Sequence, residues 1–92
     1  MIKSFCHKGL KQLVESGRAK GVSLDLESRI LKILDYLDAA ETVHDMNVAG
    51  LRLHELKGDR KGTWSVAVSG NWRITFSFRE GDAFDVDLED YH

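Results

Sequence analysis

Apolar and polar residues alternate through the second half of the chain. The apolar members of the three runs are Trp64, Val66 and Val68; Trp72, Ile74, Phe76 and Phe78; and Phe84, Val86 and Leu88. A period of two is typical of strands with one buried face, and residues 69–71 and 80–82 between the runs have turn composition. The pattern therefore predicts two β-hairpins with one apolar face, to which both tryptophans and Phe84 belong, and one polar face.

The first half of the chain has helical spacing instead. In residues 23–40 the apolar positions recur three and four apart, at Leu26, Ile30, Ile33, Leu34 and Leu37. Ser23 is a suitable N-cap, and acids in the first turn favour a helix start there. A shorter helix is predicted over residues 8–15, with Leu10, Leu13 and Val14 on one side. The other face of the long helix is expected to be solvated, at Glu27, Lys32, Asp35 and Asp38.

The remaining segments complete one domain. Residues 1–5 favour a short strand, glycines at 17 and 21 mark a loop, and residues 41–50 favour a connection with an extra turn. Ninety-two residues make a single domain, 1–92, with one core. The order of elements predicts an α+β fold, in which an N-terminal strand and two helices pack on one face of a mainly antiparallel sheet.

Composition narrows the cellular setting. The chain has no proline and one cysteine, Cys6, which has no partner for an intramolecular disulfide, so a reducing cytoplasm is the natural setting. No apolar run approaches the roughly 20 residues that a membrane span needs, and the N-terminus is not of signal-peptide type. We therefore expect a cytoplasmic protein without a membrane partner.

The net charge of −2 hides an uneven distribution. Residues 51–79 carry six Lys or Arg and two acids, whereas residues 80–92 carry six acids and no Lys or Arg. The overall balance argues against indiscriminate binding of nucleic acid, but a local basic surface remains.

The polar face of the predicted sheet carries groups suited to metal-free RNA cleavage. In that reaction the 2′-OH attacks the adjacent phosphorus, and the protein removes a proton, stabilises phosphorane charge and protonates the leaving oxygen. His54 is a candidate acid or base, with an exposed strand histidine as the alternative. Arg73 points to the polar face and is a candidate phosphate ligand, and a cross-strand ion pair with Asp85 or Asp87 is equally consistent.

Two further groups belong to this candidate site. Lys57, Arg60 and Lys61 lie in a glycine-bounded loop that is either a phosphate-binding tip or a soluble turn. Asp90, Tyr91 and His92 end the chain, where chain ends usually fray. Alternation puts Tyr91 on the polar face with Arg73, and Asp90 and His92 on the other. No spacing of histidines or cysteines suits a metal, so no metal or cofactor is expected.

Several spaced motifs resemble the HigB toxins of the RelE/ParE superfamily. They comprise residues 53–65, 71–76 and 89–92, with supporting similarity at 1–5 and 16–22, so the resemblance covers the whole chain. It implies a RelE-like fold and a ribosome-dependent mRNA endonuclease that cuts codons in the ribosomal A site. It also implies a DNA-binding, helix-turn-helix HigA antitoxin as partner.

The resemblance also assigns roles to residues. It implies that His54, Asp90, Tyr91 and His92 are catalytic, that Arg73 stabilises the transition state and that Lys57 contacts the substrate. Two alternatives remain at this point. One is a ParE-like toxin that inhibits DNA gyrase without cutting RNA, and the other is a non-catalytic binding module.

Overall fold

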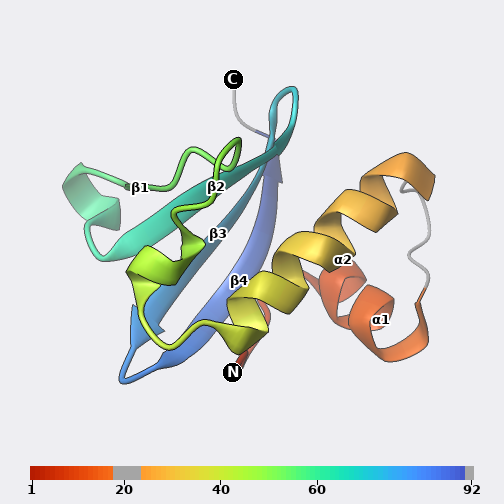
Figure 1. Cartoon of the computed structure of the whole chain (residues 1–92), viewed down its shortest axis with the longest axis horizontal. Coiled ribbons are helices and arrows are strands. Elements are labelled where there is room, and N and C mark those ends of the chain that lie inside the picture. Colours follow the sequence, from red (N-terminus) through yellow and green to blue (C-terminus); the bar gives the residue numbers. More distant parts are fainter. Residues whose placement is uncertain (18–23, 91–92) are drawn as a thin grey trace.

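The computed structural model describes residues 1–17 and 24–90 and has two layers, a sheet with both helices on one side of it (Figure 1). Four antiparallel strands follow one another across the sheet: β1 (His54–Glu55), β2 (Thr63–Ser69), β3 (Trp72–Arg79) and β4 (Asp82–Asp90). The helices are α1 (Lys8–Ser16) and α2 (Leu24–Ala39), and short 3-10 turns occur at η1 (Val43–Met46) and η2 (Gly58–Arg60). The predicted α+β architecture is confirmed, including the extra turn after α2.

Local capping fixes the bounds of α1. The His7 ring accepts a hydrogen bond at Nδ1 from the Leu10 amide at 3.2 Å, which satisfies one of the free N–H groups at the helix start. At the other end Gly17 has a φ of 79° and donates its N–H to the Leu13 carbonyl. This left-handed conformation strongly favours glycine and ends the helix. The predicted α2 cap, Ser23, and loop residues 18–22 lie outside the described residues.

Two predictions about helix faces are wrong. Glu27 is buried, with 6% of its surface exposed, although it was expected on the solvated face. It lies three residues before Ile30 and seven before Leu34, a spacing that brings it to their side of α2. Val14 is 48% exposed, because it lies at the margin of the short apolar face that Leu10 and Leu13 bury.

The core lies between α2 and the inner face of the sheet. Its fully buried side chains include Ile30 and Leu37 from α2, and Val66, Ile74 and Phe76 from the two central strands. Burial of each large apolar side chain contributes roughly 1.5–3 kcal/mol before entropy is counted. The two central strands of the sheet are therefore held firmly against the helical layer, and they supply a rigid base for groups on the other face.

A bulge in β4 overturns the expected placement of Phe84. The register shifts between Thr75 and Ser77, and Asp85 has a φ of 54°. The extra residue reverses the alternation, so Ala83 is buried instead of Phe84. Phe84 is partly buried, and the guanidinium of Arg79 lies 4.1 Å from its ring centroid.

The two tryptophans do not both belong to the core. Trp64 is partly buried and packs against the core, as expected. Trp72 is 37% exposed, because it is the first residue of β3 and lies at the hairpin end of the sheet. Its assignment to the core was therefore wrong.

The N-terminal segment pairs with the outer edge of β4. Ile2 forms a parallel bridge with Ala83, and Phe5 forms one with Val86. The Ile2 amide also donates to Asp38 of α2 at 2.9 Å. The predicted strand at residues 1–5 therefore consists of isolated bridges and not of a continuous ladder.

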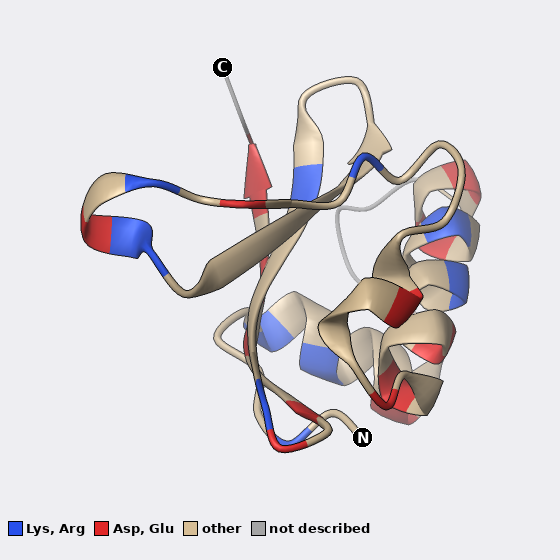
Figure 2. Cartoon of the chain, turned by 60° about the vertical axis from the view of Figure 1, so that its left-hand side comes forward, with Lys and Arg blue, Asp and Glu red and all other residues tan. Residues whose placement is uncertain are grey.

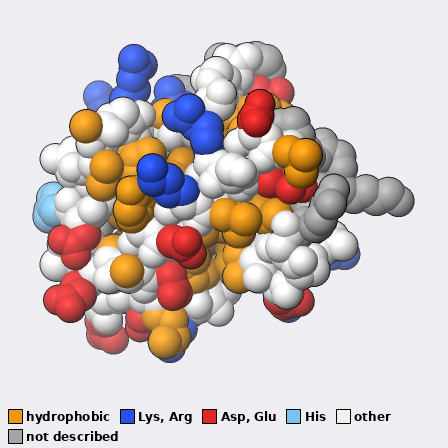
Figure 3. All heavy atoms as spheres, turned by 45° about the vertical axis from the view of Figure 1, so that its right-hand side comes forward, with side chains coloured by type: hydrophobic (Ala, Val, Ile, Leu, Met, Phe, Trp, Pro, Cys, Tyr) orange, Lys and Arg blue, Asp and Glu red, His pale blue; other side chains and the backbone are white. Residues whose placement is uncertain are grey.

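On the helix side, hydrophobic side chains reach the surface with Lys and Arg side chains among them (Figure 3). A shallow hollow of about 310 Å³ lies between α2 and residues 48–51, and its lining includes Arg29, Lys32, Tyr36 and Val48. Within residues 1–17 and 24–90, none of the helices has the length and apolar character to cross a membrane.

Candidate functional site

The sheet face away from the helices carries the groups that sequence analysis singled out. Strand register places side chains of paired residues on the same face. One cross-strand row runs from His54 through Ser65 and Thr75 to Asp87, and the next contains Ala67, Arg73 and Glu89. His54 and Arg73 therefore occupy neighbouring rows of one face, although they lie on different strands.

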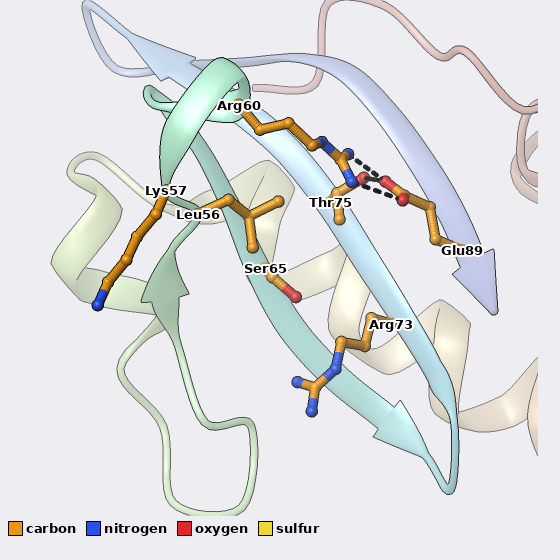
Figure 4. A pocket seen from close by; sticks show the side chains of 7 residues that line it. All are labelled: Leu56, Lys57, Arg60, Ser65, Arg73, Thr75 and Glu89. Atoms are coloured by element: carbon orange, nitrogen blue, oxygen red, sulfur yellow. Dashed lines mark hydrogen bonds and ion pairs between the residues drawn. The ribbon is translucent and has the colours of Figure 1, made fainter. Parts of the chain in front are cut away.

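A cavity of about 240 Å³ opens on this face (Figure 4). Its lining comes from three strands and the loop after β1: Leu56, Lys57, Arg60, Ser65, Arg73, Thr75 and Glu89. The hydroxyl of Ser65 is fully buried, and among the described residues no hydrogen-bond partner reaches it. A buried hydroxyl of this kind, beside cations, suits a ligand with hydrogen-bonding oxygens.

Arg73 lies on the polar face, as its alternation predicted, and it lines the cavity. It is half-buried, and its register partner on β4 is Glu89, not Asp85 or Asp87. Asp85 instead interacts with Ser4, whose hydroxyl accepts from the Asp85 amide at 2.8 Å. Partial burial strengthens the interaction of the guanidinium with any anion that enters the cavity.

Arg60 reaches across the cavity to Glu89. Its guanidinium donates from both terminal nitrogens, at 2.8 Å to Oε1 and 2.5 Å to Oε2 of Glu89. The Thr75 hydroxyl also donates to Glu89 Oε2, at 2.5 Å. The hydrogen bonds from Arg60 lower the pKa of Glu89, and that from Thr75 lowers it further, against partial burial that raises it. The same contact raises the pKa of Arg60.

This network makes stability depend on acid pH. Because the folded-state pKa of Glu89 is depressed, its contribution to stability is present above its ordinary value of 4.5 and lost as pH falls through the folded value. We expect the wild-type free energy of unfolding to exceed that of Glu89→Gln by about 1 kcal/mol at neutral pH, a small value because the pair is partly exposed. Urea unfolding over a pH series should show this gap closing below pH 4.5. A constant gap would contradict the assignment.

The cations of the 57–61 loop lie in different surroundings. In Figure 2 this loop projects from the sheet and carries blue Lys and Arg positions together with a red acidic position. Lys57 lines the cavity and also a second hollow on the outer side of the loop, where Lys61 lies. Lys57 therefore borders the cavity directly, Arg60 is bound to Glu89, and Lys61 lies outside.

A backbone carbonyl orients the His54 ring. Its Nδ1 lies 3.1 Å from the Arg52 carbonyl oxygen, which only accepts hydrogen bonds. The neutral ring therefore carries its proton on Nδ1 and leaves the Nε2 lone pair available. Arg52 has a φ of 52°, an uncommon conformation for a non-glycine residue that sets the direction of this carbonyl. His54 is exposed and does not line the cavity.

The three C-terminal candidates are placed only in part. Asp90 ends β4 and is paired in register with Trp72, so it shares the helix-side parity that sequence analysis gave it. It is exposed and is not part of the cavity lining. Tyr91 and His92 lie outside the described residues.

Sequence reasoning missed Glu89, Thr75 and Ser65 as members of the site. Sequence analysis named Glu89 only as part of residues 89–92, which resemble the HigB toxins. Its alternation with Asp87 nevertheless put it on the polar face. Its contact with Arg60 spans 29 residues of sequence, so no local pattern predicts it. The available signal was an acid on the polar face of a strand close to a cation-rich loop.

Comparisons with known proteins agree with this architecture. Residues 3–92 match a family model described as the RelE-like toxin of the type II toxin–antitoxin system HigB. The chain is 50% identical over 92 residues to the endoribonuclease HigB of Proteus vulgaris, with all of both chains covered. It is 30% identical over 91 residues to toxin HigB-1 of Vibrio cholerae serotype O1, covering 97% of this chain and 96% of the relative. The chain therefore belongs to the HigB family of RelE-like toxins of type II toxin–antitoxin systems.

Proposed function

We propose that this toxin is an endoribonuclease that cleaves mRNA in the ribosomal A site by metal-free acid–base catalysis. The observation that carries the proposal is the cavity that Lys57 and Arg73 both line, on the sheet face that His54 shares. Cleavage of a phosphodiester bond is promoted by this combination of cations and a nearby proton acceptor. The full-length relative from Proteus vulgaris, named an endoribonuclease, supports the same activity.

Each residue has a distinct part in the proposed reaction. His54 takes the proton of the 2′-OH at Nε2, and the oxygen then attacks the adjacent phosphorus. Arg73 stabilises the added charge on the phosphorane, and the buried Ser65 hydroxyl donates to one of its oxygens. The bond to the 5′-oxygen breaks, and that oxygen receives a proton from His92. Tyr91 shares in the proton transfers and Asp90 orients one of these partners. The products are a 2′,3′-cyclic phosphate and a 5′-OH.

Substrate binding uses the basic loop. Lys57 and Lys61 contact phosphates on either side of the cleaved bond, as point charges that carry no sequence information. The net charge of −2 provides little general attraction for RNA, so the local basic surface of residues 51–79 has to supply it. We therefore propose the 30S subunit and its RNA as partners, and the cytoplasm as the location.

Membership of the family implies an antitoxin partner for this chain. We propose that this partner is a helix-turn-helix protein of the HigA type. Its complex with the toxin would prevent mRNA cleavage until the antitoxin is removed.

The test uses purified protein and ribosomes that hold a 5′-labelled mRNA with a defined codon in the A site. We expect cleavage within that codon, a 2′,3′-cyclic phosphate on the upstream fragment, and little cleavage of the same RNA without ribosomes. Intact mRNA in this reaction would contradict the proposal. If the protein also caused gyrase–DNA cleavage complexes to accumulate in a topoisomerase assay, the result would indicate the ParE-like activity instead.

A further inference from the structure

Arg60 lines the cavity and is bound there to the carboxylate of Glu89. Both terminal nitrogens of its guanidinium are directed at Glu89, and Thr75 holds the same carboxylate from the central strand (Figure 4). Two parallel hydrogen bonds between a guanidinium and a carboxylate are among the strongest polar contacts in proteins. A phosphate could use this fork only by displacing a carboxylate that two residues already hold.

The pair also changes the charge that a substrate would meet. The positive charge of Arg60 is neutralised locally by Glu89, whose side chain is only 29% exposed. Lys57 and Arg73 also line the cavity. In Figure 4 the Arg60–Glu89 pair and the Arg73 guanidinium lie at opposite ends of the site.

The position of the pair indicates a different role. Arg60 is the last residue of η2, three residues after Lys57. Glu89 is the penultimate residue of β4 and immediately precedes Asp90. The contact thus ties the substrate-binding loop to the strand from which the C-terminal catalytic residues continue, across β2 and β3.

We propose that Arg60 and Glu89 are paired positioning residues, which hold the 57–61 loop and the end of β4 in the arrangement needed for cleavage, and that Arg60 is not a phosphate ligand. The inference rests on the proposed function, because it assigns roles within that site. It predicts that the two residues act as a unit, so that losing either has nearly the effect of losing both.

The experiment measures single-turnover cleavage by programmed ribosomes for Arg60→Ala, Glu89→Gln and the double variant. We expect each single variant to lower the maximal rate by about 10-fold, with the protein concentration for half-maximal rate within about twofold of wild type. The double variant should be no slower than the slower single variant. Arg60→Lys, which keeps the charge but loses the planar fork, should behave like Arg60→Ala.

Salt dependence separates positioning from phosphate binding. Each phosphate contact with a single strand contributes about 0.7 to the slope of log affinity against log salt. The slope of the logarithm of the half-maximal protein concentration against the logarithm of the salt concentration should be unchanged in Arg60→Ala. In Lys57→Ala this slope should be smaller by about 0.7. Lys11→Ala, an exposed cation on α1, serves as the matched control and should follow wild type in rate and slope.

Three results would overturn the inference. These are additive rate losses in the double variant, a salt slope reduced in Arg60→Ala and retained in Arg60→Lys, or tighter binding in Glu89→Gln because Arg60 is released to the substrate. An inactive wild-type protein would instead refute the proposed function, so the two failures are distinguishable. Thermal unfolding of each variant shows that the rates refer to folded protein.

Discussion

Replacing Arg73 by alanine is expected to lower the rate of mRNA cleavage on the ribosome by about 10²–10³-fold. The guanidinium is half-buried in the cavity, on the central strand β3, whose neighbours Ile74 and Phe76 are fully buried against the helices. A cation held in this way needs little reorganisation when charge develops on the phosphorane. Single-turnover rates at saturating protein measure the effect directly.

Arg79 provides a matched control for Arg73 on the same strand. It lies at the far end of β3, with its guanidinium over the Phe84 ring and not in the cavity. Arg79→Ala should therefore cleave within about twofold of wild type, because its contact contributes only about 1 kcal/mol to stability. A rate for Arg73→Ala within threefold of the Arg79→Ala rate would show that Arg73 does not stabilise the transition state.

Replacing His54 by alanine should reduce cleavage by about 10²–10⁴-fold, the usual contribution of a positioned proton acceptor. The Arg52 carbonyl holds the proton on Nδ1 and leaves Nε2 free to accept one. Single-turnover rates of both proteins on programmed ribosomes provide the measurement.

His44 is the corresponding control among the histidines. It lies in η1, and its ring packs edge-on against Trp64 with centroids 6.3 Å apart, on the other side of the sheet from the proposed site. His44→Ala should cleave at about the wild-type rate. If His54→Ala also keeps most of the rate, another group accepts the proton.

The periodic elements of this fold could be predicted because burial dictates their pattern. The helix α2 and the strands β2 and β3 each place apolar residues at the spacing of their own geometry, and the structure confirms their ranges closely. The prediction failed where a local irregularity changed the phase. The bulge at Asp85 moved Phe84 off the core face. The apolar and polar pattern of that stretch does not indicate the extra residue.

The candidate site likewise contains residues whose placement could be predicted from the sequence and contacts that could not. The face of Arg73 was predictable because strand alternation alone determines it, and Lys57 was a candidate because it lies in a glycine-bounded loop. The partnership of Arg60 with Glu89 was not predictable, since it depends on where the loop folds back over the sheet and on the register of β4. Long-range contacts of this kind are set by tertiary packing, which local spacing does not encode.

The central claim is that this toxin cuts mRNA during translation with groups at the end of its chain. We would express the intact chain and a version ending at Glu89, and map breaks in a cellular mRNA by primer extension. The account predicts breaks within codons for the intact chain and none for the shortened one. Equal breaks from both versions would contradict a role for Asp90, Tyr91 and His92, and growth arrest without breaks would contradict RNA cleavage altogether.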